Sequence, residues 1–152
     1  MNKKLVIGLG SAVGFGLLIL LAVISFNSRA ETAEAGQTSK QSADKVQVYL
    51  FHATQRCTTC IAIGKLAGET IAEYFQPETR DGKIEFKEIN IDLPENKELA
   101  KKFQASGSAL YINAIKDGQD NISEDINVWR LTTNEVQFKG YLKDKLNNLL
   151  GK

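Results

Sequence analysis

The feature that most constrains the fold is an alternation of strand and helix patterns after residue 44. The run KVQVYLFH at 45–52 is rich in branched and aromatic residues, which is typical of a strand. The run CIAIGKLAGETIAEYF at 60–75 instead places its apolar residues at helical spacing. A turn region at 77–82 leads to a second strand pattern, KIEFKEINI, at 83–91. Each predicted strand is therefore separated from the next by a predicted helix.

The second half of this region continues the alternation. We expect a helix at about 94–104, because its proline falls in the first turn, where a missing N–H costs little. A third strand at 108–115, a turn at 116–119 and a fourth strand within 121–130 follow. An amphipathic helix at 134–150 ends the chain. The order strand, helix, strand, helix, strand, strand, helix predicts one domain of the α/β class.

The apolar spacing also predicts which residues face the core. For the three helices in chain order, the predicted inner faces are Ile63, Leu66, Ala67, Ile71, Tyr74 and Phe75; Leu99, Ala100 and Phe103; and Val136, Phe138, Tyr141, Leu142, Leu146, Leu149 and Leu150. The single tryptophan, Trp129, is expected in the core on the last strand.

The N-terminus has a different character. Lys3 and Lys4 precede an uncharged run at 5–26, which at about 1.5 Å per helical residue is long enough to cross a hydrocarbon core of about 30 Å. The alternative is a cleaved signal, because residues 28–30, Ser-Arg-Ala, form an acceptable cleavage site. Since the lysines favour the cytoplasmic side, either interpretation places the rest of the chain outside the cytoplasm.

Three regions follow from these patterns. Residues 1–26 are predicted to be a membrane anchor or signal segment. Residues 27–44 lack aromatic and branched aliphatic side chains and are predicted to be a flexible tether. Residues 45–152 form the domain. We expect a single-pass cell-membrane protein with its domain extracytoplasmic, or a secreted one if the signal is cleaved.

Composition narrows the function classes. Charged residues make up 24% of the chain and the formal net charge is +1, values typical of a globular protein with a core. Lys and Arg are interleaved with Asp and Glu, which argues against a nucleic-acid partner.

The only two cysteines, Cys57 and Cys60, lie at the junction of the first strand and helix. A helix N-terminus stabilises a thiolate through its free N–H groups and its dipole. Arg56 would add a positive charge, and the Thr58 or Thr59 hydroxyl would donate a hydrogen bond. We therefore expect Cys57 to attack a disulfide and Cys60, one turn further in, to resolve it through a Cys57–Cys60 disulfide.

The cysteine pair has two other interpretations, a structural disulfide and a metal site. A structural staple is disfavoured because the small loop that it closes restricts the unfolded chain little. A zinc site would need four ligands, and the chain offers two thiols and one histidine, His52. Two thiolates alone suit Cu(I), with His52 as a third ligand or a proton acceptor. A strand-end histidine bonded to backbone is the simpler role for His52. No metal or cofactor is predicted.

With the Cys-x-x-C opening the first helix, the domain resembles the thioredoxin-like superfamily. The stretch INIDLPENKELAKKFQASGSALYINAIKDGQ is similar to the thioredoxin segment with a strand ending in Asn-Ile-Asp, a helix, a strand and a Lys-x-Gly turn. More narrowly, FHATQRCTTC resembles small bacterial thioredoxin-like proteins labelled nitrophenyl compound nitroreductase subunits (ArsF family). The resemblance implies a three-layer sandwich, a central mixed sheet of about four strands flanked by helices, here preceded by one transmembrane helix.

The chain departs from the superfamily pattern at three places. Arg-Cys-Thr-Thr-Cys replaces Trp-Cys-Gly-Pro-Cys, and Phe51 stands where the family has a buried acid. Ser108 or its neighbours fall where the family has a cis-proline beside the cysteines. A non-proline cis bond costs about 2.5 to 4 kcal/mol, so we expect a trans peptide at Ser108.

These patterns predict a membrane-tethered, extracytoplasmic thiol-disulfide oxidoreductase or electron-transfer subunit that acts on a redox partner protein. The alternative is a non-enzymatic accessory or metallochaperone domain that binds Cu(I) or a reductase partner through the same cysteines. The oligomeric state is left open.

Overall fold

The computed structural model describes residues 41–152, which contain ten helices and strands. In chain order these are β1 (Lys45–His52), α2 (Thr58–Tyr74), α3 (Gln76–Arg80), β2 (Ile84–Asn90), the 3-10 helix η1 (Pro94–Asn96), α4 (Lys97–Phe103), β3 (Ala109–Ile115), β4 (Ile122–Glu124), the 3-10 helix η2 (Ile126–Arg130) and α5 (Glu135–Leu150).

The four strands form one mixed sheet in the order β2-β1-β3-β4. Strand β1 pairs in parallel with β2 and antiparallel with β3, and β3 pairs antiparallel with β4. A parallel pair needs a crossover connection, and α2 with α3 supplies it between β1 and β2. The mixed four-stranded sheet expected from the sequence is confirmed.

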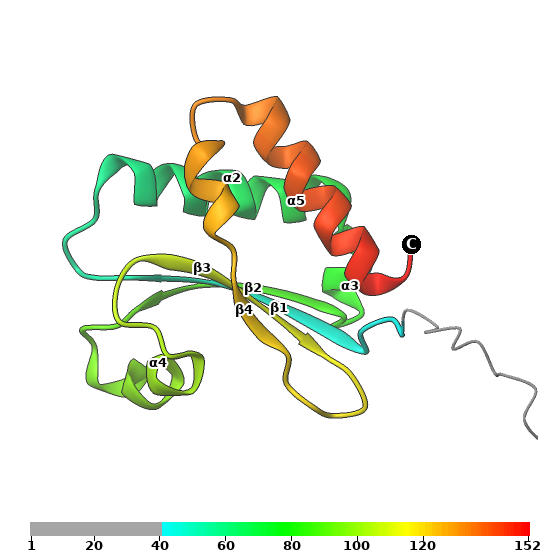
Figure 1. Ribbon diagram of the computed structural model, residues 1–152, viewed down its shortest axis with the longest axis horizontal. Helices are drawn as coiled ribbons and strands as arrows, with labels where there is room; N and C mark the ends of the chain where they lie inside the picture. Colours follow the sequence, from blue (N-terminus) through cyan, green and yellow to red (C-terminus); the bar gives the residue numbers. More distant parts are fainter. Residues whose placement is uncertain (1–40) are drawn as a thin grey trace, which may run out of the picture. The chain divides into compact units, whose positions relative to one another are not determined.

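The helices cover both faces of this sheet. Helices α2 and α5 lie over one face and α4 lies over the other, which gives three layers (Figure 1). Because successive strand side chains point to opposite faces, β1 contributes to both cores. Its Val46, Val48 and Leu50 pack under α2 and α5, whereas Tyr49 and Phe51 pack under α4.

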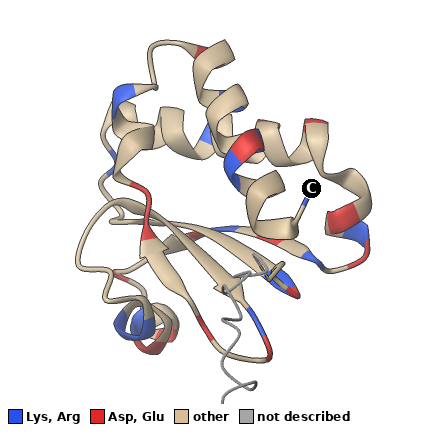
Figure 2. Ribbon diagram, turned by 45° about the vertical axis from the view of Figure 1, so that its right-hand side comes forward, with Lys and Arg blue, Asp and Glu red and all other residues tan. Residues whose placement is uncertain are grey.

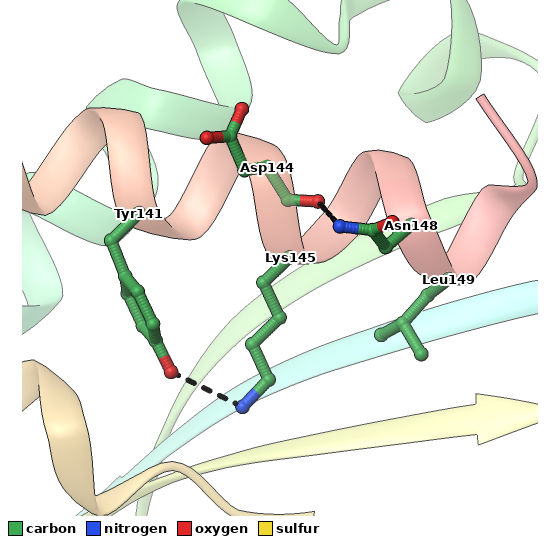
Figure 3. A pocket seen from close by; sticks show the side chains of 5 residues that line it. All are labelled: Tyr141, Asp144, Lys145, Asn148 and Leu149. Carbon is green, nitrogen blue, oxygen red and sulfur yellow. Dashed lines mark hydrogen bonds between the residues drawn. The ribbon is translucent and has the colours of Figure 1, made fainter.

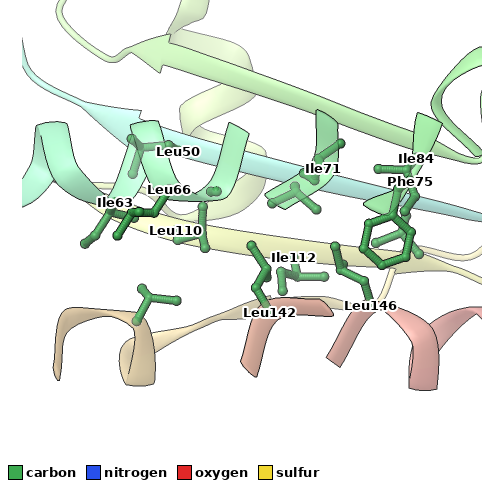
Figure 4. Packing of buried hydrophobic residues seen from close by; sticks show 14 of the residues in the cluster. Leu50, Ile63, Leu66, Ile71, Phe75, Ile84, Leu110, Ile112, Leu142 and Leu146 are labelled. Atoms are coloured by element: carbon green, nitrogen blue, oxygen red, sulfur yellow. The ribbon is translucent and has the colours of Figure 1, made fainter. Parts of the chain in front are cut away.

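The two cores differ in size and kind. The larger one, beneath α2 and α5, is mainly aliphatic (Figure 4) and includes Ile63, Leu110, Leu142 and Leu146, all fully buried. The smaller one is mainly aromatic, and the tilted rings of Phe51 and Phe103 pack there with centroids 5.2 Å apart. The position that the resemblance assigned to a buried acid, Phe51, therefore holds an apolar core residue.

Two predicted elements have a different form. Residues 126–130 make a 3-10 helix, so only Ile122–Glu124 of the predicted fourth strand is strand, and Trp129 lies half-buried against the core in η2. Part of the predicted turn at 77–82 is the helix α3, which starts beside a proline that can occupy a first helical turn.

Two residues predicted on inner faces are exposed. Val136 is 82% exposed because the buried residues of α5 follow a spacing of four from Phe138, and position 136 lies away from that stripe. Tyr74, the last residue of α2, is 39% exposed, and the Lys143 ammonium lies 4.4 Å from its ring centroid.

The predicted anchor and most of the predicted tether lie outside the described residues. Within residues 41–152, none of the helices is long and apolar enough to cross a membrane. The end of the predicted tether meets the domain: the Ala43 N–H donates to the Leu149 carbonyl at 2.7 Å, and the Asp44 N–H donates to that of Ile115 at 2.8 Å.

Candidate thiol site

The cysteine pair lies at the first turn of α2. This helix begins at Thr58, two residues before the predicted start at 60. Cys57 is the N-cap, with an extended backbone, and its Sγ accepts a hydrogen bond from the Cys60 N–H at 3.3 Å. Helix N-caps are usually Ser, Thr, Asp or Asn, whose side-chain oxygen accepts such a bond. Here a sulfur takes that place, and the Cys60 N–H at the helix end points at it.

The two sulfurs differ in access. Cys57 is exposed, and Cys60 is buried with 3% of its surface accessible. Both are free thiols in this structure. A partner molecule can therefore reach the first sulfur and not the second.

The electrostatics of the pair are set by burial and by hydrogen bonds. Burial raises the pKa of the Cys60 thiol, but hydrogen bonds from the side chains of Cys57 and Ser108 and from nearby backbone lower it by more, so the pKa lies below its ordinary value. The lowered pKa favours ionisation of the buried sulfur despite its burial.

Ser108 lies directly before β3 and hydrogen-bonds to the Cys60 sulfur through its side chain. The structure thus brings this residue to the cysteine pair, as the resemblance implied for the chain segment that opens the third strand. The peptide bonds of residues 41–152 are all trans, in agreement with the expectation for Ser108. A serine hydroxyl here offers the buried sulfur a hydrogen-bond donor, which a proline cannot.

Arg56 lies beside the pair, but its charge is directed elsewhere. Its Nη1 donates to Glu88 Oε2 of β2 at 2.5 Å, and its Nη2 donates to the Cys60 carbonyl at 3.3 Å. We expected this cation to act on Cys57; in the structure it pairs with Glu88 and also bonds the Cys60 carbonyl in the first turn of α2. Its Nε is buried without a hydrogen-bond partner.

The end of β2 also holds the loop that leads to the cysteines, residues 53–56. The Thr54 N–H donates to Asp92 Oδ2 at 2.7 Å, and Asn90 Nδ2 donates to Thr54 Oγ1 at 3.0 Å. Bonds from the backbone and side chain of Thr54 lower the pKa of the Asp92 carboxyl. We call residues 53–60 the cysteine loop, and Glu88, Asn90 and Asp92 its clamp.

The remaining predicted site residues make no bond to sulfur. Thr58 is exposed and Thr59 half-buried, and neither hydroxyl donates to Cys57 or Cys60 within the described chain. His52 is half-buried, and its Nδ1 lies 2.9 Å from the Ala53 carbonyl, the backbone-bonded arrangement expected of a strand-end histidine. Residues 41–152 contain no group of three or more His, Cys, Asp or Glu side chains placed to hold a metal ion.

A second cluster of polar residues lies away from the cysteines, where η2 meets α5. The Asp125 carboxylate, 1% exposed, accepts from the Tyr141 hydroxyl at 2.9 Å, the Lys145 ammonium at 2.9 Å and the Asn127 N–H at 3.2 Å. Burial alone would lower the pKa of Lys145, but the bond to Asp125 raises it above its usual value. We call these four residues the Asp125 cluster.

A groove of about 420 Å³ runs along α5 over this cluster, and Tyr141 and Lys145 point into it with Leu149 (Figure 3). Their polar atoms are already bonded to Asp125 or to each other. Elsewhere, Lys/Arg and Asp/Glu segments are interspersed along the helices (Figure 2), as where Lys139 of α5 pairs with Glu69 and Glu73 of α2.

No protein-family model and no curated protein matches the chain. Solved structures of thioredoxins are similar to it. That of Malassezia sympodialis is 23% identical and covers 66% of this chain and 81% of its own, with a TM-score of 0.39. That of Thermus thermophilus is 13% identical over 69% and 76%, with a TM-score of 0.43. Chloroplastic thioredoxin z is 18% identical over 90% and 99%, with a TM-score of 0.37.

These likenesses are at the level of the fold and carry no argument about activity. The thioredoxin-like arrangement rests on the element order, the sheet order β2-β1-β3-β4 and the Cys-x-x-C at the start of the helix that follows β1.

Proposed function

We propose that the domain exchanges a dithiol for a disulfide with a partner protein. The observation that carries this proposal is the pairing of an exposed sulfur at a helix N-cap with a buried sulfur one turn inside the same helix. An attacking thiolate needs access and charge stabilisation, and a resolving thiol needs protection from other partners.

In the proposed reaction, the Cys57 thiolate attacks one sulfur of the partner disulfide, and the other partner sulfur leaves as a thiolate. Cys60 loses its proton and attacks Cys57 Sγ, which releases the second partner sulfur. The products are a Cys57–Cys60 disulfide and a partner dithiol, so two electrons and two protons pass to the partner. The reverse reaction oxidises the partner, and the reduction potentials of the two pairs set the direction.

The lowered pKa of the Cys60 thiol supports a role for Ser108 in this exchange. Its hydroxyl bonds the Cys60 sulfur and lowers the pKa of that thiol against the effect of burial. A buried cysteine without such a donor would hold its proton and resolve the mixed disulfide slowly. Ser108 would therefore speed the second step.

The alternative function is Cu(I) binding by the two thiolates. Soft thiolates suit this ion, and two are present. Within residues 41–152, the two cysteines do not belong to any group of three or more His, Cys, Asp or Glu side chains that could hold a metal ion. We therefore place thiol exchange first.

The wider setting remains part of the proposal. The apolar run at 5–26 supports a single-pass anchor with the domain on the extracytoplasmic side, where a disulfide persists. The segment FHATQRCTTC supports membership of the small bacterial nitroreductase-subunit group, in which the domain would act as an electron-transfer subunit.

Equilibration with glutathione tests the proposal against copper binding. The full-length chain, in detergent, is incubated in buffers of varied reduced and oxidised glutathione, and the fraction with a Cys57–Cys60 disulfide is read from alkylated intact mass. We expect reversible oxidation with loss of two thiols per chain. A chain that stays reduced in every buffer, and whose reduced form takes one Cu(I) from a chromophoric chelator, would overturn it in favour of copper binding.

A further inference from the structure

The Arg56–Glu88 pair is an unusual use of a cation beside a thiol site. Arg56 immediately precedes the N-cap Cys57, and one of its nitrogens bonds the Cys60 carbonyl in the same helical turn. An unpaired arginine at this place would stabilise a thiolate. Its charge is instead met by the Glu88 carboxylate at 2.5 Å.

A glycine of α2, Gly64, leaves space for the Glu88 side chain of this pair. At Gly64 of α2, an added Cβ would lie 2.5 Å from Glu88 Oε1 and 2.8 Å from Leu50 Cδ2, so any other residue there would force these side chains to move. Glu88 thus lies against the helix one turn after Cys60. From that place Glu88 Oε2 accepts a hydrogen bond from Arg56 Nη1.

The pair is also incomplete. The Arg56 side chain is 23% exposed and that of Glu88 34%, and Arg56 Nε is buried without a partner. A cluster built for stability satisfies its buried polar atoms, since an unsatisfied one costs free energy. A role in the chemistry of a nearby site is one explanation for such an atom, and Arg56 directly precedes Cys57 in the chain.

We infer that Glu88 is a positioning residue that holds the Arg56 guanidinium away from the Cys57 sulfur and so keeps the cysteine pair more reducing than its helix-N-terminal place alone would make it. This inference rests on the proposed thiol exchange. A cation near the thiolate stabilises the reduced form of a dithiol, and a stabilised reduced form makes the pair a stronger oxidant. Withholding the cation has the opposite effect.

The test uses the equilibrium protein dithiol + oxidised glutathione ⇌ protein disulfide + two reduced glutathiones, measured on the full-length chain. We expect Glu88→Gln to lower the equilibrium constant for forming the protein disulfide about fivefold, the size of a partly screened charge interaction across a few ångströms. Because tenfold in this two-electron couple is about 30 mV, fivefold corresponds to a potential about 20 mV higher.

The decisive comparison is the same substitution without the arginine. In an Arg56→Gln background, Glu88→Gln should change the equilibrium constant less than twofold, because no cation is left to release. In an Arg56→Lys background, Glu88→Gln should again lower the constant, because it frees the lysine ammonium from its carboxylate partner. Glu85→Gln is the matched control: it removes the same charge from the same strand, where Glu85 pairs with Lys45 and Lys87, and should change the constant less than twofold.

Each result decides a separate point. No shift with Glu88→Gln, or the same shift with and without Arg56, would overturn the positioning role, since Glu88 would then act directly or not at all. A wild-type chain that never equilibrates with glutathione would instead overturn the proposed exchange itself.

Discussion

The Arg56–Glu88 pair beside the cysteines and the Asp125 cluster under α5 each join a cation to a carboxylate, yet they differ in how fully their polar atoms are hydrogen-bonded. In the Asp125 cluster the carboxylate is 1% exposed and accepts three hydrogen bonds. In the Arg56–Glu88 pair both side chains are partly exposed, and one buried nitrogen of Arg56 has no partner.

The difference separates two roles for an ion pair. A buried, fully bonded carboxylate is costly to disturb, because its partners would be left unpaired in a low-dielectric interior. A partly exposed pair contributes little to stability and is free to set the electrostatics of its neighbours. The first cluster holds η2 to α5, and the second adjusts the cysteine turn.

Substituting Asp125 should have the largest effect on stability. Asp125→Ala leaves Lys145 and Tyr141 without their acceptor, and we expect a loss of about 3 kcal/mol in the free energy of unfolding. Urea unfolding of the full-length chain measures this. The glutathione equilibrium of the folded variant should stay within twofold of wild type. A loss below about 1 kcal/mol would show that the bonded cluster does not brace η2 against α5.

Substituting Gly64 should disturb the other region through sterics. Gly64→Ala places a methyl group 2.5 Å from Glu88 Oε1, and overpacking of this kind costs about 1 to 3 kcal/mol. It should also displace Glu88 and shift the glutathione equilibrium in the same direction as Glu88→Gln.

Gly140→Ala on α5 is its control, because nothing lies within 4 Å of the added Cβ. Helix propensity alone should then stabilise the chain by about 0.5 to 1 kcal/mol. Equal effects of the two substitutions on unfolding would contradict the close contact between α2 and Glu88.

Removing the charge of Glu88 should affect stability least among these substitutions. We expect Glu88→Gln to change the free energy of unfolding by less than about 1 kcal/mol, because partly exposed ion pairs are weak. The same variant should shift the redox equilibrium, as argued above. A large loss of stability with an unchanged equilibrium would reverse the roles assigned to the two clusters.

Acid should loosen the cysteine loop through Asp92. The pKa of this carboxyl is lowered in the folded protein by its bonds to Thr54. Its contribution is therefore complete above the unfolded value, about 3.9, and is lost as the pH falls through the lower folded value. The Thr54 amide resonance should move in this range, and Asp92→Asn should remove the movement. A Thr54 resonance that is constant in acid would mean that the clamp does not depend on this charge.

Much of the fold could be predicted because it follows from local patterns. Strand and helix periodicity located β1, α2, β2 and α5 to within two residues. The fourth strand lies within the predicted range 121–130, but Trp129 was placed wrongly on that strand, because the Asp125 side chain caps a 3-10 helix at 126–130 by accepting the Asn127 N–H. The 3-10 helix at this place also depends on the buried bonds of Asp125 to Tyr141 and Lys145, which lie further along the chain in α5.

The site was predictable only where sequence spacing sets it. The Cys-x-x-C at the strand-to-helix junction placed Cys57 outside and Cys60 inside. The partners of the cysteine loop, which are Glu88 and Asn90 of β2 and Asp92 just after it, are brought there by parallel pairing of β1 with β2, a long-range contact with no local signal. The Asn-Ile-Asp segment at 90–92 resembles the thioredoxin pattern, but the bonds that Asn90 and Asp92 make to Thr54 depend on the register of the two strands.

The most direct test of the proposed chemistry is to stop the exchange halfway. The full-length Cys60→Ser chain and, separately, the Cys57→Ser chain are treated briefly with oxidised glutathione, and the intact mass is measured after quenching with acid. We predict that the Cys60→Ser chain accumulates a stable mixed disulfide on Cys57. The Cys57→Ser chain should react at least tenfold more slowly, because its remaining sulfur, on Cys60, is buried. The wild-type chain should pass on to the internal disulfide. Equal reaction of the two variants, or no adduct on Cys57, would contradict the assignment of Cys57 as the attacking sulfur.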